Sequence, residues 1–180
     1  MSSLRAALSR LPTPLRRSIQ ERAYPALLAE GETAPEWHLQ SWDGTWHRQG
    51  KHWTVMVFYP DDAGAPGAVS RAQLAAFQSA LPEFDALGVR VVGVNPAEAE
   101  PQRALAESAG ITFPLLTDRG ASVARRFRAA IQLPFSPMLL RAVYLVNPAR
   151  TIRLANRGTP SVDAIVRTVQ ALQAASRTGM

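Results

Sequence analysis

The sequence of 180 residues contains no cysteine. A chain without a thiol forms no disulfide, holds no metal through thiolates and performs no cysteine-based redox chemistry. Lysine is almost absent too, because 19 arginines and the single lysine Lys51 make up the 20 basic residues. The net charge of +6 attracts phosphates and anionic surfaces without specifying a partner.

Long apolar runs are also missing. No run approaches the roughly 20 residues that span a bilayer, and the N-terminus lacks the apolar core of a signal peptide. We therefore expect a cytoplasmic protein without a membrane partner. The three histidines, His38, His47 and His52, do not have the spacing of a zinc motif. We expect neither a metal nor a cofactor.

The tightest group of arginines gives little support for nucleic-acid binding. Arg125, Arg126 and Arg128 surround one aromatic residue, Phe127, whereas a stacking surface for bases needs several. A solvated helix face accounts for this group, and we expect no specific nucleic-acid partner.

Residues 1–30 form a separate segment. Its apolar residues recur every three or four positions among five arginines, at Leu4, Leu8, Leu11, Leu15 and Ile19. Pro12 and Pro14 interrupt this pattern, so we predict two short basic amphipathic helices rather than one. The segment is either an arm that docks on a membrane surface or a partner, or an extension that packs its leucines on the domain. We take packing as the simpler account.

Residues 31–180 alternate between strand-like and helical segments. Asp43-Gly44 predicts a hairpin turn, and Pro82 should divide the helical run that precedes the next strand. Strands are predicted near 53–59, 89–94, 114–118, 141–146 and 151–156, and helices near 98–109, near 120–128 and from Thr159. This order predicts an α/β fold of the thioredoxin-like type, with a central mixed sheet flanked by helices and an N-terminal helical extension.

Five segments carry a resemblance in their order and spacing. They are GETAPEWHL at 31–39, VMVFYP at 55–60, LPEFDALGVRVVGVN at 81–95, FPLLTDRGASVARRF at 113–127 and RAVYLVNP at 141–148. Together they resemble the peroxiredoxins, the alkyl hydroperoxide reductase/thiol-specific antioxidant family, and most closely its bacterioferritin-comigratory branch. The resemblance covers about 31–175 and implies a thiol peroxidase.

The loop that carries the reactive cysteine in that family has no thiol in this chain. Pro60 matches the proline of the loop, whereas Ala65 stands at its threonine and Ala68 at its peroxidatic cysteine. Peroxide reduction of this type needs a thiolate and then a sulfenic acid, and an alanine supplies neither. Ser70 is the nearest hydroxyl, and we interpret it as a residue of the first helical turn.

Part of the family's peroxide pocket is predicted to remain. Gly67 and Ala68 should lie where a helix begins, and Arg141 matches the arginine that binds peroxide in the family. With Pro60 they make a candidate site for a small anion. The alternative is that Arg141 is satisfied by a carboxylate such as Asp62, or by backbone carbonyls.

Two functions follow from the resemblance. The first is a non-catalytic member of the family that acts by binding, as a homodimer or in a complex with an active peroxiredoxin. The second is an antioxidant oxidoreductase with residual cysteine-independent activity, so whether the chain is an enzyme stays open.

Overall fold

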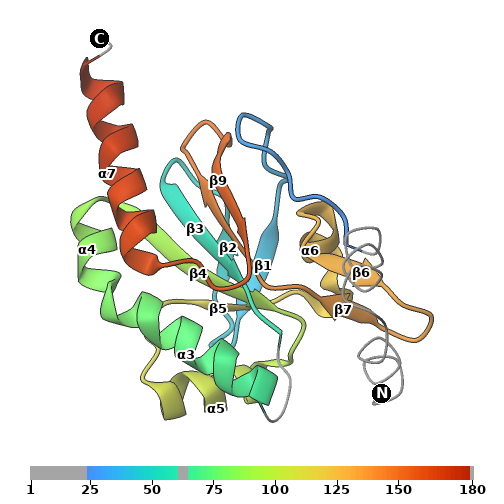
Figure 1. Ribbon diagram of the computed structural model, residues 1–180. Helices are drawn as coiled ribbons and strands as arrows, with labels where there is room; N and C mark the ends of the chain where they lie inside the picture. Colours follow the sequence, from blue (N-terminus) through green and yellow to red (C-terminus); the bar gives the residue numbers. More distant parts are fainter. Residues whose placement is uncertain (1–23, 61–64, 179–180) are drawn as a thin grey trace, which may run out of the picture.

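The computed structural model describes residues 24–60 and 65–178 (Figure 1). The two amphipathic helices predicted from the leucine pattern fall almost entirely outside these residues. Residues 24–30 are irregular, and Leu28 is buried in the core. The boundary at residue 30 therefore stays a prediction.

A seven-stranded mixed sheet forms the centre of the domain (Figure 1). Strands β3, β4 and β5 are parallel, and the outer strands β2, β1, β8 and β9 are antiparallel to their neighbours. In sheet order the strands are β2 (Trp46–Arg48), β1 (His38–Ser41), β5 (Leu115–Thr117), β4 (Val89–Asn95), β3 (Trp53–Phe58), β8 (Ala142–Val146) and β9 (Ile152–Arg157). The predicted mixed sheet is confirmed.

The helices follow the predicted order, although α3 begins earlier and the last helix later than the sequence predicted. They are α3 (Ala65–Ser79), α4 (Leu81–Ala86), α5 (Ala99–Ala109), the 3₁₀ turn η1 (Arg119–Ala121), α6 (Ser122–Arg126) and α7 (Val162–Thr178). Pro82 lies at the start of α4, where a missing N–H is tolerated, so the predicted division between α3 and α4 is confirmed. The last helix begins at Val162 rather than at Thr159.

A small second sheet was not predicted. Strands β6 (Ala130–Gln132) and β7 (Pro137–Leu139) form an antiparallel hairpin. In Figure 1 this hairpin extends from the side of the domain that carries α6. Its strands have three residues each, which is too short for a period-two pattern to stand out in the sequence.

The residues of β3 divide the core into two layers. Val55 and Val57 pack against one group of buried side chains, which includes residues of α3, α4 and α7. Met56 and Phe58 face the opposite layer, which contains residues of α6, β6 and the chain before β1. Because both faces of the strand are buried, its sequence is almost uninterruptedly apolar.

Tyr144 in β8 fixes the chain before β1 to the domain. Its hydroxyl donates to the carbonyl of Phe127 at 2.5 Å and accepts from the N–H of Leu28 at 3.3 Å. Burial raises the pKa of Tyr144 to about 12, so the hydroxyl keeps the proton that it donates. Residue 28 is thereby held beside the end of α6.

Candidate functional site

The residues predicted to form the site come from three elements. Pro60 follows β3, Arg141 directly precedes β8, and α3 begins at Ala65. Because β3 and β8 are neighbours in the sheet, the end of one lies beside the start of the other. The structure therefore places Pro60 and Arg141 at the same edge of the sheet, next to α3.

The hydroxyl of Ser70 connects these elements. Nη2 of Arg141 donates to Oγ of Ser70 at 2.7 Å, and this Oγ donates to the carbonyl of Pro60 at 2.6 Å. Ser70 is 3% exposed, and a hydrogen bond from a cation in such a place is stronger than one between neutral groups. Arg141 thus donates to a hydroxyl inside the protein. The carboxylate predicted as its alternative partner, Asp62, lies outside the described residues, so that alternative stays a prediction.

The helix begins earlier than the sequence predicted, and two expectations change as a result. Ser70 is the sixth residue of α3 and lies in its second turn, so placing it in the first turn was wrong. Gly67 and Ala68 are the third and fourth residues rather than the start of the helix. The field of a helix terminus acts mainly within its first turn, so Ala68 lies at the margin of that field.

Ala68 also lies on a different side of α3 from Ser70. Successive residues of an α-helix are about 100° apart, so positions 68 and 70 differ by about 200°. In agreement with this geometry, Ala68 is exposed and Ser70 is buried. The contact between Ser70 and Arg141 is therefore on the side of the helix away from Ala68. The small-anion site built from Pro60, Gly67, Ala68 and Arg141 stays a prediction, in which an anion would share Arg141 with Ser70.

Ser70 is the site residue that the sequence interpretation underestimated. It belongs to the buried face of α3, four and seven residues before Leu74 and Phe77. On the same side, Nε2 of Gln73 donates to the carbonyl of Gly158 at 3.3 Å, and the N–H of Gly158 donates to the carbonyl of Arg141 at 3.0 Å. Ser70, Leu74 and Phe77 recur at helical spacing. This spacing could have predicted that Ser70 lies on the buried face of the helix.

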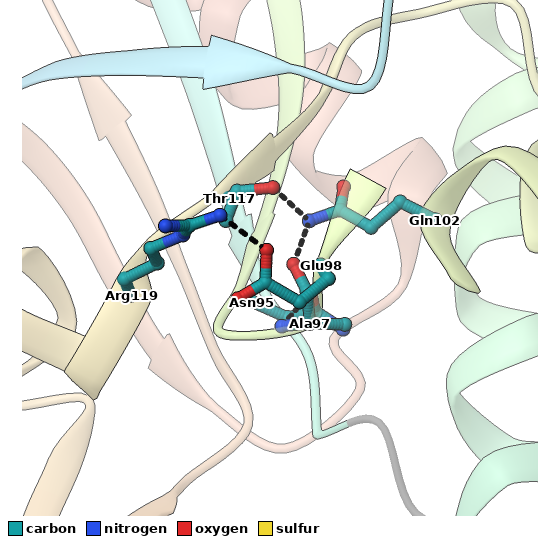
Figure 2. Close-up of polar contacts among 6 residues, drawn as sticks. All are labelled: Asn95, Ala97, Glu98, Gln102, Thr117 and Arg119. Atoms are coloured by element: carbon teal, nitrogen blue, oxygen red, sulfur yellow. Dashed lines mark hydrogen bonds and ion pairs between the residues drawn. The ribbon is translucent and has the colours of Figure 1, made fainter. Parts of the chain in front are cut away.

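A second polar cluster lies where β4 and β5 end (Figure 2). The side chain of Asn95 accepts from the N–H of Ala97 at 3.0 Å, and Nε2 of Gln102 donates to the carbonyl of Ala97 and to Oγ1 of Thr117, each at 3.0 Å. Figure 2 also shows the exposed ion pair between Arg119 and Glu98. These contacts hold the connection between β4 and α5, so the cluster has a structural role.

The one serine–histidine contact near the edge of the sheet has the wrong proton arrangement for catalysis. Nδ1 of His47 accepts a hydrogen bond from Arg90, so in the neutral ring Nε2 carries the proton and donates to Oγ of Ser41 at 2.8 Å. The hydroxyl of Ser41 in turn donates to Asp43 at 2.6 Å. Burial and the charge of Arg90 lower the pKa of His47. A histidine that donates to a serine cannot take its proton.

The fold and the site define a thioredoxin-like domain of the peroxiredoxin type. The structure is similar to a crystal structure of Peroxidoxin BcpB from Mycobacterium tuberculosis, with a TM-score of 0.73, 22% identity and coverage of 80% of this chain and 97% of that one. It is also similar to Xylella fastidiosa PrxQ, with a TM-score of 0.70, 21% identity and coverage of 84% and 99%. The predicted thioredoxin-like α/β fold with a central mixed sheet is confirmed, whereas the N-terminal helical extension lies outside the described residues.

Sequence comparison identifies the family. Residues 31–155 match the model of the AhpC/TSA family, and the chain belongs to that family. It is 33% identical over 76 residues to Peroxiredoxin Bcp of Xanthomonas campestris pv. campestris, a match that spans 42% of this chain and 46% of that protein. It is 26% identical over 145 residues to the chloroplastic Peroxiredoxin Q of Triticum aestivum, spanning 79% and 65%. These matches cover less than two thirds of either relative.

Replacing Ser70 by alanine should destabilise the fold. The change removes the hydroxyl that joins Arg141 to Pro60, and a hydrogen bond to a charged group contributes about 1.5–3 kcal/mol. We expect the free energy of unfolding, measured by urea denaturation, to fall by about that amount. Ser79→Ala is the control, because that exposed hydroxyl in the same helix only donates to the carbonyl of Ala75. Equal stability of Ser70→Ala and Ser79→Ala would contradict the role of Ser70.

Proposed function

We propose that this chain is a peroxiredoxin-family protein that acts by binding and not by turning over peroxide. The observation that carries the proposal is the alanine at position 68, in a chain that has no cysteine at any position. The chemistry of the family requires a thiolate that attacks the O–O bond and a thiol that regenerates it. No side chain of this sequence supplies either step.

The geometry around Arg141 supports the same proposal. In a thiol peroxidase, a nearby cation stabilises the thiolate and so lowers the pKa of the thiol. Here Arg141 donates to Ser70 instead, and the family's cysteine position is exposed on another side of α3. The site thus lacks the sulfur atom, and the described contact of Arg141 is with Ser70. The alternative function, a cysteine-independent antioxidant activity, has only the family relationship in its favour.

Strand β9 ends the order of the seven-stranded sheet. Its first residue, Ile152, already bonds to Gly31 and Glu32, so the stretch centred on Ala155 is the part of this edge that we propose for a partner. The N–H of Gly158 bonds to the carbonyl of Arg141, and in an antiparallel register this pattern directs the N–H of Ala155 away from β8. Self-pairing centred on Ala155 would place Arg153 of one copy opposite Arg157 of the other. Like charges in opposite positions destabilise a sheet. An acidic edge strand of an active relative therefore suits β9 better than a second copy of the chain does.

Introducing a thiol tests whether the site retains its chemistry. We expect Ala68→Cys to react with hydrogen peroxide at a rate within about threefold of Ala72→Cys, because both positions are exposed on the same face of α3. The readout is loss of free thiol under pseudo-first-order peroxide. Reaction at Ala68→Cys a hundredfold faster than at Ala72→Cys would mean that the pocket still activates sulfur, and would contradict the geometric argument.

Mass photometry tests the proposed mode of binding. We expect the purified chain to be monomeric and to gain mass when an active peroxiredoxin with an acidic edge strand is added. Ala155→Pro should prevent this gain, since it removes the outward N–H of β9 while leaving the bonds to β8. A stable homodimer, or a complex unchanged by Ala155→Pro, would contradict pairing along β9.

A further inference from the structure

The turn of the β6–β7 hairpin presents an aromatic side chain to solvent. The N–H of Leu133 donates to the carbonyl of Ser136 at 3.2 Å and closes the turn around Pro134 and Phe135. Phe135 is wholly exposed, more so than any other large apolar side chain in the described ranges. A phenyl ring held entirely in water buries no area in the domain, so all of its apolar surface is accessible to an apolar partner.

Exposed arginines without acidic partners lie at the base of this hairpin. Arg125 donates to the side chain of Gln132, the last residue of β6, at 2.8 Å. Arg126 and Arg128 follow directly and are exposed. Ion pairs elsewhere engage other arginines, among them Arg103, Arg119, Arg150 and Arg153. In the described part of the chain, no carboxylate lies within 4.0 Å of Arg125, Arg126 or Arg128.

The N-terminal segment joins the domain at the same place. Nη2 of Arg157 donates to the carbonyl of Pro25 at 2.6 Å and to that of Arg128 at 2.9 Å. Tyr24, the first residue that the structure describes, is itself 39% exposed. In Figure 1 the described chain starts beside α6 and β6. Residues 1–23, with five arginines and one glutamate among their leucines, are therefore attached next to the hairpin.

We infer that Phe135, Arg125, Arg126 and Arg128, here called the hairpin surface, dock on the surface of an anionic lipid bilayer. The arginines contact lipid phosphates, and the phenyl ring enters the boundary between headgroups and acyl chains. Peripheral binding strengthens with the apolar area that is inserted and with the attraction of basic residues to anionic lipids, and the hairpin surface supplies both.

A bilayer fits the hairpin surface better than nucleic acid does. Binding of single strands uses aromatic side chains arranged along a basic groove, so that successive bases stack. Phe135 is a single ring at the tip of a turn, and the other aromatic residue nearby in sequence, Phe127, is buried. In the described residues no helix is long and apolar enough to cross a membrane, so the inferred contact is peripheral. The expectation of no membrane partner rested on the missing apolar run, which has no bearing on a peripheral contact.

Vesicle flotation of the full chain tests the inference. We expect binding to vesicles of phosphatidylcholine mixed with phosphatidylglycerol, no binding to phosphatidylcholine alone, and weaker binding as salt is raised. The double variant Arg126→Gln, Arg128→Gln should bind roughly thirtyfold more weakly, since each arginine near an anionic surface contributes a factor of about five. Phe135→Ser should weaken binding about tenfold.

The controls separate the hairpin surface from charge alone. Arg48→Gln with Arg167→Gln removes the same charge at exposed positions in β2 and α7, and Trp46→Ser removes another exposed aromatic side chain. Both controls should bind vesicles as the parent does. The inference is overturned if anionic vesicles do not bind the parent, or if binding is unchanged in the hairpin variants. Equal loss in the controls, or tighter binding to single-stranded DNA than to vesicles, would also overturn it.

Discussion

The site depends on one hydroxyl group that joins three elements of the fold. Ser70 on α3 accepts a hydrogen bond from Arg141 at the start of β8 and donates one to the carbonyl of Pro60 at the end of β3. Such a contact aligns the helix with two neighbouring strands and gives a half-buried cation a hydrogen-bond acceptor inside the protein. The chain keeps the fold of its family, and Arg141 is joined to α3 through this hydroxyl.

The sequence predicted the fold well because its strongest signals are long and periodic. The apolar strand β3, the division at Pro82 and the hairpin turn at Asp43-Gly44 were all visible in the sequence, and the structure has each of them. The hairpin of β6 and β7 was missed, because strands of three residues leave little pattern. The start of α3 was placed too late, and this error put Ser70 in the first turn and Ala68 at the helix terminus. Because α3 begins at Ala65, two residues before Gly67, Ser70 lies in the second turn on the buried face and Ala68 lies at the end of the first turn.

The two surfaces that we propose for interaction are the edge of β9 and the hairpin surface. The edge of β9 presents backbone groups between Arg153 and Arg157, and the hairpin surface presents Phe135 beside arginines that lack acidic partners. The two are linked through Arg157, which lies in β9 and holds both Pro25 and Arg128. Arginine is suited to such places because its guanidinium stays charged and offers several donors. Arginines such as Arg157 and Arg141 therefore hold segments of the domain together, in addition to raising the net charge.

The central claim is that no side chain of this protein replaces the missing thiol. The most direct measurement is the consumption of hydrogen peroxide and of an organic hydroperoxide by metal-free protein, coupled to a thiol reductant and compared with buffer. The account predicts a rate equal to that of buffer over many equivalents of peroxide. Sustained, reductant-dependent consumption that scales with the concentration of pure protein would contradict it.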